Sequence, residues 1–137
     1  MPLTDQQAFD TTLAHLRKQR VRSAYGTTCR YRDCGDGSDK SVRMCAVGCL
    51  IPNAEYDPKM DARNLSVYRL LEEFPVPTLQ GLDKRLLHAM QRAHDAQLGD
   101  VTHSPESQAA GLDRWENAMA RVASDFKLSY APPASPA

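Results

Sequence analysis

Apolar residues recur at helical spacing in several stretches of the chain. In the first, Phe9, Leu13 and Leu16 follow one another at intervals of four and three, as on one face of a helix. Thr4 precedes this stripe and has a glutamine three residues later, which is the sequence of a capping box. The pattern therefore predicts a helix over residues 5–20.

Two longer stripes and one shorter stripe predict further helices in the second half of the chain. Ser66 is positioned to cap a short helix, Thr78 to cap a long one that Gly99 ends, and Ser104 to cap another. The long stripes contain Leu79, Leu82, Leu86, Met90 and Ala93, and then Leu112, Trp115, Met119, Val122 and Phe126. We expect these faces to pack into one core, because none can bury its apolar surface alone.

A β-hairpin is predicted between the first helix and the rest. Residues 27–32 and 41–45 have β-prone residues, and an Asp-Gly turn separates them. A turn centred near residue 37 would place Cys29 opposite Cys45. The apolar run 46–51 that follows is interpreted as a short buried helix.

Composition places these elements in a globular protein. The chain has 137 residues, of which 42% are hydrophobic and 25% charged, which excludes a wholly disordered chain and a coiled-coil rod. We predict a mostly α, α+β fold of four to five helices with one β-hairpin. Residues 1–130 are expected to form a single globular domain, and the Pro/Ala-rich residues 131–137 a disordered tail. No apolar run reaches membrane-spanning length and the N-terminus lacks signal-peptide features, so a cytoplasmic location is expected.

Positive charge is concentrated near the end of the first helix. The net charge is zero, but residues 17–32 hold six basic side chains and no acidic one. Such a cluster is typical of a solvated helix end, and it also suits an acidic protein surface or phosphate groups. Zero net charge weighs against nucleic acid. The candidate contact residues are Arg20, Arg22, Arg30, Tyr31, Arg32 and Arg43.

Four cysteines lie close together in a C-x4-C-x10-C-x3-C array: Cys29, Cys34, Cys45 and Cys49. They would suit a structural zinc site, although hairpin zinc knuckles more often use a C-x2-C spacing. A disulfide is disfavoured by the reducing cytosol. The interpretation we favour is that of packed thiols, because free cysteine is among the most buried residue types. No cofactor is therefore assigned, and zinc remains the possible one.

A catalytic thiolate is a further hypothesis. Cys45 would lie where the return strand meets the short helix, and a helix N-terminus lowers a thiol pKa. His94 is the best available base for Cys45 or Cys49. Asp95 follows His94 directly in the sequence, so we expect its carboxylate to point elsewhere on the helix, which weakens a triad.

The cysteine region also carries a family resemblance. Cys29-Arg-Tyr-Arg, a Gly/Asp turn and the block Cys45-Ala-Val-Gly-Cys-Leu-Ile-Pro52 resemble a group of small uncharacterised proteins of tailed bacteriophages and prophage regions. The segments Met90–Asp95 and Trp115–Ala123 resemble later parts of that group. Asn53 stands where the group usually has Asp, and Cys34 looks like an additional cysteine, so a four-cysteine zinc site would not be a shared feature.

The resemblance implies a phage origin and no established activity. Small phage proteins of this size often bind and inhibit a host protein, including defence machinery. The first hypothesis is therefore a non-enzymatic binding module that acts on a host protein in the bacterial cytoplasm. The alternatives are a cysteine-dependent enzyme using Cys45 or Cys49 with His94, and a zinc-stabilised nucleic-acid binder. No membrane partner is expected, and a small-molecule substrate is not specified by the sequence.

Overall fold

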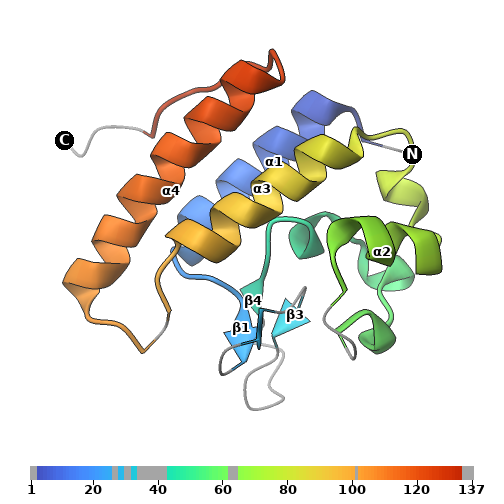
Figure 1. Cartoon of the computed structure of the whole chain (residues 1–137), viewed down its shortest axis with the longest axis horizontal. Helices are drawn as coiled ribbons and strands as arrows, with labels where there is room; N and C mark the ends of the chain where they lie inside the picture. The colour runs from blue at the N-terminus through green and yellow to red at the C-terminus, as the bar shows by residue number, and fades with distance from the viewer. Residues whose placement is uncertain are drawn as a thin grey trace.

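Helices make up most of the computed structural model, and three long ones lie side by side (Figure 1). The structure describes residues 3–25, 28–29, 32–33, 43–61, 65–100 and 102–133. In this part of the chain the α-helices are α1 (Asp5–Gln19), α2 (Val67–Glu73), α3 (Lys84–Gln97) and α4 (Pro105–Asp125). The 3-10 turns are η2 (Gly48–Leu50), η3 (Asn53–Glu55), η4 (Pro58–Asp61) and η5 (Pro77–Leu79). The predicted class, a mostly helical α+β fold, is confirmed.

At three of the four described α-helices, the cap is the residue that the sequence predicts. The Oγ1 of Thr4 accepts from the backbone N–H of Gln7 at 3.1 Å, and the Gln7 side chain accepts from Thr4 N–H at 2.9 Å. This is the predicted capping box of α1. Ser66 and Ser104 cap α2 and α4 as expected. Their hydroxyls satisfy N–H groups that have no partner inside the helix.

The predicted start of α3 is wrong by about one and a half turns. Thr78 does not cap it; the cap is Asp83, whose side chain accepts from the N–H of Arg85 at 2.9 Å. Gly81 lies between the two candidate caps with φ +89°, a left-handed conformation that interrupts any helix from Thr78. Thr78 instead donates from its N–H and its hydroxyl to the Glu55 carboxylate, at 2.9 and 2.6 Å.

The β-structure consists, in the described part, of two antiparallel pairs of very short strands. β3 (Arg32–Asp33) pairs with β4 (Arg43–Met44), so the predicted hairpin exists with Arg32 opposite Met44. β1 (Ala24–Tyr25) pairs with β2 (Thr28–Cys29), which was not predicted. The prediction that Cys29 lies opposite Cys45 is therefore wrong. Cys29 lies opposite Ala24, because its strand pairs with the preceding strand β1 and is not part of the β3–β4 ladder.

The apolar core lies where α1, α3 and α4 face one another and extends to α2 and to the segment around η2. Trp115, Phe9, Leu16 and Met90 are among the fully buried side chains. The stripes that predict the helices therefore also supply the core. Gly111 lets the backbone of α4 approach the end of α3, since a Cβ there would lie 2.8 Å from the carbonyl oxygen of Gln97.

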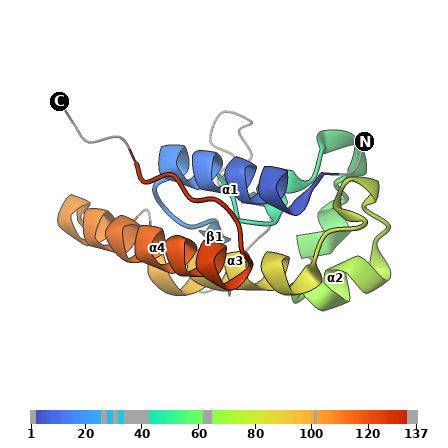
Figure 2. The same ribbon diagram turned by 90° about the horizontal axis from the view of Figure 1, so that it is seen from above.

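The chain after α4 turns back along the molecule, and Figure 2 shows it running beside α1 and α4. The amide of Gln6 accepts from the N–H of Ser129 at 2.9 Å and donates to its carbonyl at 3.1 Å. Arg17 forms a bidentate ion pair with Glu116 and also donates to the carbonyl of Ala131 at 2.7 Å. Residues 131–133 of the predicted disordered tail are exposed, and 134–137 lie outside the described residues.

Candidate functional site

The candidate contact residues are distributed over the C-terminal end of α1 and the strands that follow. Arg20 is exposed and ends α1 in a left-handed conformation, φ 70°. Arg22 and Arg43 are half-buried. Arg30 and Tyr31 lie outside the described residues, and of Arg32 the structure describes the backbone, in β3.

Backbone pairing brings three arginine-bearing segments together. Arg32 is opposite Met44 in the β3–β4 pair and Asp33 is opposite Arg43, so the two strands that carry these arginines lie side by side. The hydroxyl of Ser23 donates to the carbonyl of Arg43 at 3.1 Å, so the segment that carries Arg22 also lies against β4. Residues far apart in the sequence thus meet at one end of the molecule.

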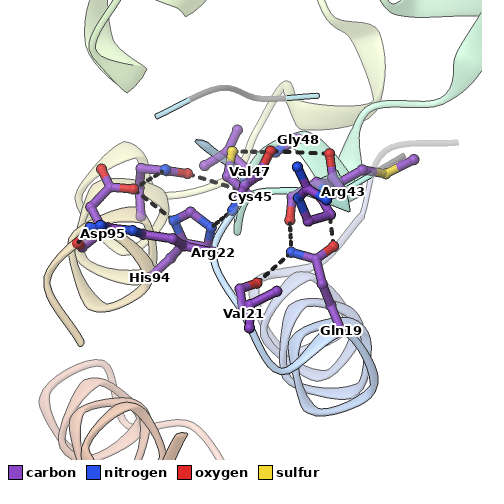
Figure 3. A network of polar contacts seen from close by, with 12 residues as sticks. Gln19, Val21, Arg22, Arg43, Cys45, Val47, Gly48, His94 and Asp95 are labelled. Carbon is purple, nitrogen blue, oxygen red and sulfur yellow. Dashed lines mark hydrogen bonds and ion pairs between the residues drawn. The ribbon is translucent and has the colours of Figure 1, made fainter. Parts of the chain in front are cut away.

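Gln19, the last residue of α1, holds this junction (Figure 3). Its Oε1 accepts from the N–H of Met44 at 2.8 Å, and its Nε2 donates to the Met44 carbonyl at 2.9 Å. The same Nε2 donates to the carbonyl of Val21 at 2.7 Å. The side-chain amide of Gln19 therefore bonds both the N–H and the carbonyl of Met44, as the backbone of a neighbouring strand would. Sequence reasoning missed Gln19, because a glutamine in a last helical turn carries no distinguishing signal.

His94 is fully buried in α3 and makes two hydrogen bonds (Figure 3). Its Nε2 accepts from the backbone N–H of Ser23 at 2.9 Å, so this nitrogen carries no proton. The proton is on Nδ1, which donates to Oδ1 of Asp95 at 2.7 Å. The expectation that Asp95 points elsewhere is wrong, because its short side chain turns back to the neighbouring imidazole.

Gln91 extends this contact toward the cysteine block. Its Nε2 donates to the same Oδ1 of Asp95 at 2.9 Å, and its Oε1 accepts from the N–H of Val47 at 3.2 Å. A continuous chain of hydrogen bonds therefore runs from Ser23 through His94, Asp95 and Gln91 to Val47. Sequence reasoning also missed Gln91, which lies one turn before Asp95 on the same helix face.

The two described thiols are packed among structural partners. Cys45 is fully buried, and its sulfur accepts from the N–H of Gly48 at 3.2 Å. Burial raises the pKa of Cys45 well above its ordinary value. Cys49 donates to the carbonyl of Ala46 at 3.3 Å and lies 3.7 Å from Oγ1 of Thr12; burial raises its pKa to about 11. A nucleophilic thiolate needs the opposite shift.

The described residues test the zinc hypothesis only in part, because they include the side chains of two of the four candidate ligands. Among them, no group of three or more His, Cys, Asp or Glu side chains is placed to hold a metal ion. The Cys29 side chain and the whole of Cys34 lie outside what is described. A zinc site that includes them stays a prediction.

These features define a small, mostly helical α+β protein with an arginine-rich end and a chain of hydrogen bonds that passes through the buried His94. Comparison with known protein families, curated proteins and solved structures finds no match for this chain. Among the described helices, none combines the length and the apolar character that crossing a bilayer requires.

Proposed function

We propose that this chain is a phage-type, non-enzymatic binding protein that acts on a host protein in the bacterial cytoplasm. The phage origin rests on the resemblance of the cysteine block, and the host target follows from what small phage proteins often do. Inhibition of a defence protein is one form of such an activity. The contact surface is the arginine-rich end, defined as the C-terminal end of α1 with β3 and β4.

The observation that carries this proposal is the meeting of three backbone segments that each carry an arginine. β3, which carries Arg32, pairs with β4, which carries Arg43, and the Ser23–Arg43 hydrogen bond holds the chain after α1 against β4. Arg20 adds an exposed cation at the end of α1. Arginine is enriched in protein interfaces, and a positive patch speeds association with a negative partner.

The contacts of the candidate catalytic groups favour binding over cysteine chemistry. The Nε2 lone pair of His94 is occupied by the Ser23 N–H, so it is not available to accept a proton from a thiol. Cys45 and Cys49 have raised pKa values and structural hydrogen bonds. These side chains stabilise the fold around the arginine-rich end.

The test is capture from a nuclease-treated bacterial lysate with immobilised wild-type protein and two charge-matched variants. The first variant, Arg20→Asn with Arg32→Gln, removes two cations from the arginine-rich end; asparagine tolerates the left-handed backbone of residue 20. The control variant, Arg92→Gln with Arg121→Gln, removes two cations from α3 and α4. We expect one specific protein to be retained by wild type and control and released by moderate salt.

Capture should fall at least about tenfold with the first variant, as expected when two interface cations are lost. Equal capture by all three proteins, or no specific capture at all, would refute the proposal. Capture from an untreated lysate that is lost when the lysate is nuclease-treated would support the nucleic-acid binder instead. A native mass one zinc heavier than the denatured mass would support its zinc site.

A further inference from the structure

A hollow of about 320 Å³ lies where the end of α3 meets α4. Its polar lining comes from Arg22, Gln97, His103, Ser107 and Arg114, and none of the described residues that line it is acidic. Small-molecule sites in proteins begin at about this size. The hollow therefore has the volume, and its lining the donor groups, for a small anionic ligand.

Arg22 contributes a guanidinium whose N–H donors have only long contacts or no partner in the described structure. It donates to the carbonyl of Asp95 at 3.4 Å and lies 3.7 Å from the carboxylate of Asp100. Its Nε is buried and has no hydrogen-bond partner in the described structure. Charge-assisted hydrogen bonds normally span about 2.7–2.9 Å, so both contacts are long. The side chain is 29% exposed, which leaves the guanidinium reachable.

Arg114 presents a second guanidinium from α4. This side chain is exposed, and its terminal nitrogen lies 3.5 Å from the carbonyl of Gln97. The wall that carries it is fixed, because α4 contacts the end of α3 closely at Gly111. The two arginines therefore come from two segments whose relative position is set by backbone packing.

The nearest carboxylate, that of Asp100, faces Arg22 through Oδ2 at 3.7 Å, which is longer than a charge-assisted hydrogen bond. Oδ1 of Asp100 accepts from the N–H of Thr102 at 3.0 Å and from its hydroxyl at 3.2 Å. Nδ1 of His103 accepts from the N–H of Asp100 at 3.0 Å. His103 therefore carries its proton on Nε2, which adds a donor to the lining.

We propose that this hollow binds a phosphate group, either as the free ion or as the monoester of a small molecule. A single guanidinium satisfies both oxygens of a carboxylate, whereas a phosphate has further oxygens for donors on a second wall. Arg22 and Arg114 are such a pair, and Ser107 and Gln97 supply neutral donors beside them. The proposal does not depend on the host-protein partner, and its test uses different variants.

The test is an amide chemical-shift titration of the full chain at constant ionic strength, with inorganic phosphate, phenyl phosphate and acetate as separate probes. We expect saturable shifts with at least one of the two phosphate probes, centred on residues 97–103 and the first turns of α4. Arg114→Gln should weaken that binding about tenfold. Arg121→Gln removes the same charge two turns further along α4 and should change it less than twofold.

Tighter binding of phenyl phosphate would assign a monoester ligand, and tighter or equal binding of inorganic phosphate would assign the free ion; both outcomes support the site. The proposal is overturned if neither probe gives saturable shifts, if acetate gives the same shifts at the same concentration, or if Arg121→Gln weakens binding as much as Arg114→Gln. Arg114 is exposed, so loss of folding does not obscure the result.

Discussion

The backbone N–H of Ser23 donates a 2.9 Å hydrogen bond to Nε2 of His94, and both residues are fully buried. This bond fixes the proton on Nδ1, where Asp95 accepts it. It also connects the chain leaving α1 to the last turn of the core helix α3. A histidine that looks like a candidate base in the sequence is thus a structural connector between two segments.

Replacement of His94 should therefore reduce stability strongly. His94→Ala leaves the Ser23 N–H buried without a partner and opens a cavity, which together should cost about 3 kcal/mol of unfolding free energy. His94→Gln places an amide oxygen near the position of Nε2 and should recover part of that loss. Urea denaturation of the three proteins at pH 7.5 measures both effects.

Arg92→Ala is the matched control, because Arg92 is exposed on the same helix. It should change the unfolding free energy by less than about 0.5 kcal/mol. A loss for His94→Ala no greater than that of Arg92→Ala would show that the Ser23–His94 bond does not connect the two segments as described.

His15 should make stability depend on pH. Partial burial lowers the pKa of His15 below its ordinary value, and the Gln19 hydrogen bond opposes this shift only in part. As the pH falls below about 6.5, the unfolded chain takes up the proton first, so folded stability is present above that pH and lost below it. His15→Gln keeps a donor for Gln19 and cannot be protonated.

The prediction concerns the difference in unfolding free energy between His15→Gln and wild type. Measured by urea denaturation, it should be constant from pH 7.5 to 8.5 and should shift in favour of the variant as the pH falls to 5. The other titratable groups are the same in both proteins and cancel in the difference. A difference that stays flat, or moves toward wild type at low pH, would contradict the stated direction.

The helices were predictable because their apolar stripes are long and their caps are local. Thr4, Ser66 and Ser104 bond to groups three residues away, which a sequence displays directly. The start of α3 was mispredicted because the stripe continues through Leu79 and Leu82 although Gly81 breaks the helix between them. Apolar spacing reports burial, and residues in a turn can be buried as well.

The polar interior was not predictable for a different reason. Gln19 binds Met44 and Gln91 binds Val47 through contacts 25 and 44 residues apart in the sequence. Glutamine is common on helix surfaces, so its identity does not indicate a bond to a distant backbone segment. The position of Asp95 depended on a side-chain rotation, which residue spacing on a helix does not determine.

Gly111 should tolerate no larger residue. In Gly111→Ala the new Cβ would lie 2.8 Å from the Gln97 carbonyl oxygen and 2.8 Å from the Gly99 nitrogen, both of which are backbone atoms. Alanine is the better helix former by about 1 kcal/mol, but the clash should outweigh this and destabilise the protein by about 2 kcal/mol net. Thermal and urea denaturation measure the change.

Asn117→Ala provides the control, since Asn117 is exposed on the same helix and gains only the helix propensity. It should leave stability unchanged or raise it slightly. If Gly111→Ala behaved like Asn117→Ala, the close approach of α4 to the end of α3 would be disproved, and with it the fixed wall of the phosphate-binding hollow.

In a Cys29→Ser, Cys34→Ser background, Cys45 and Cys49 are the remaining thiols, and their reactivity can be followed separately. Burial and raised pKa values should make both alkylate slowly with iodoacetamide at pH 7, and much faster after denaturation in urea. Cys49, with a pKa of about 11, should gain rate steadily up to that pH, whereas Cys45 should remain protected by complete burial. Peptide mass analysis after timed quenching assigns each rate. Rapid modification of either thiol at pH 6 in the folded protein would show a thiolate of low pKa, and would favour the cysteine-dependent enzyme over the binding protein proposed above.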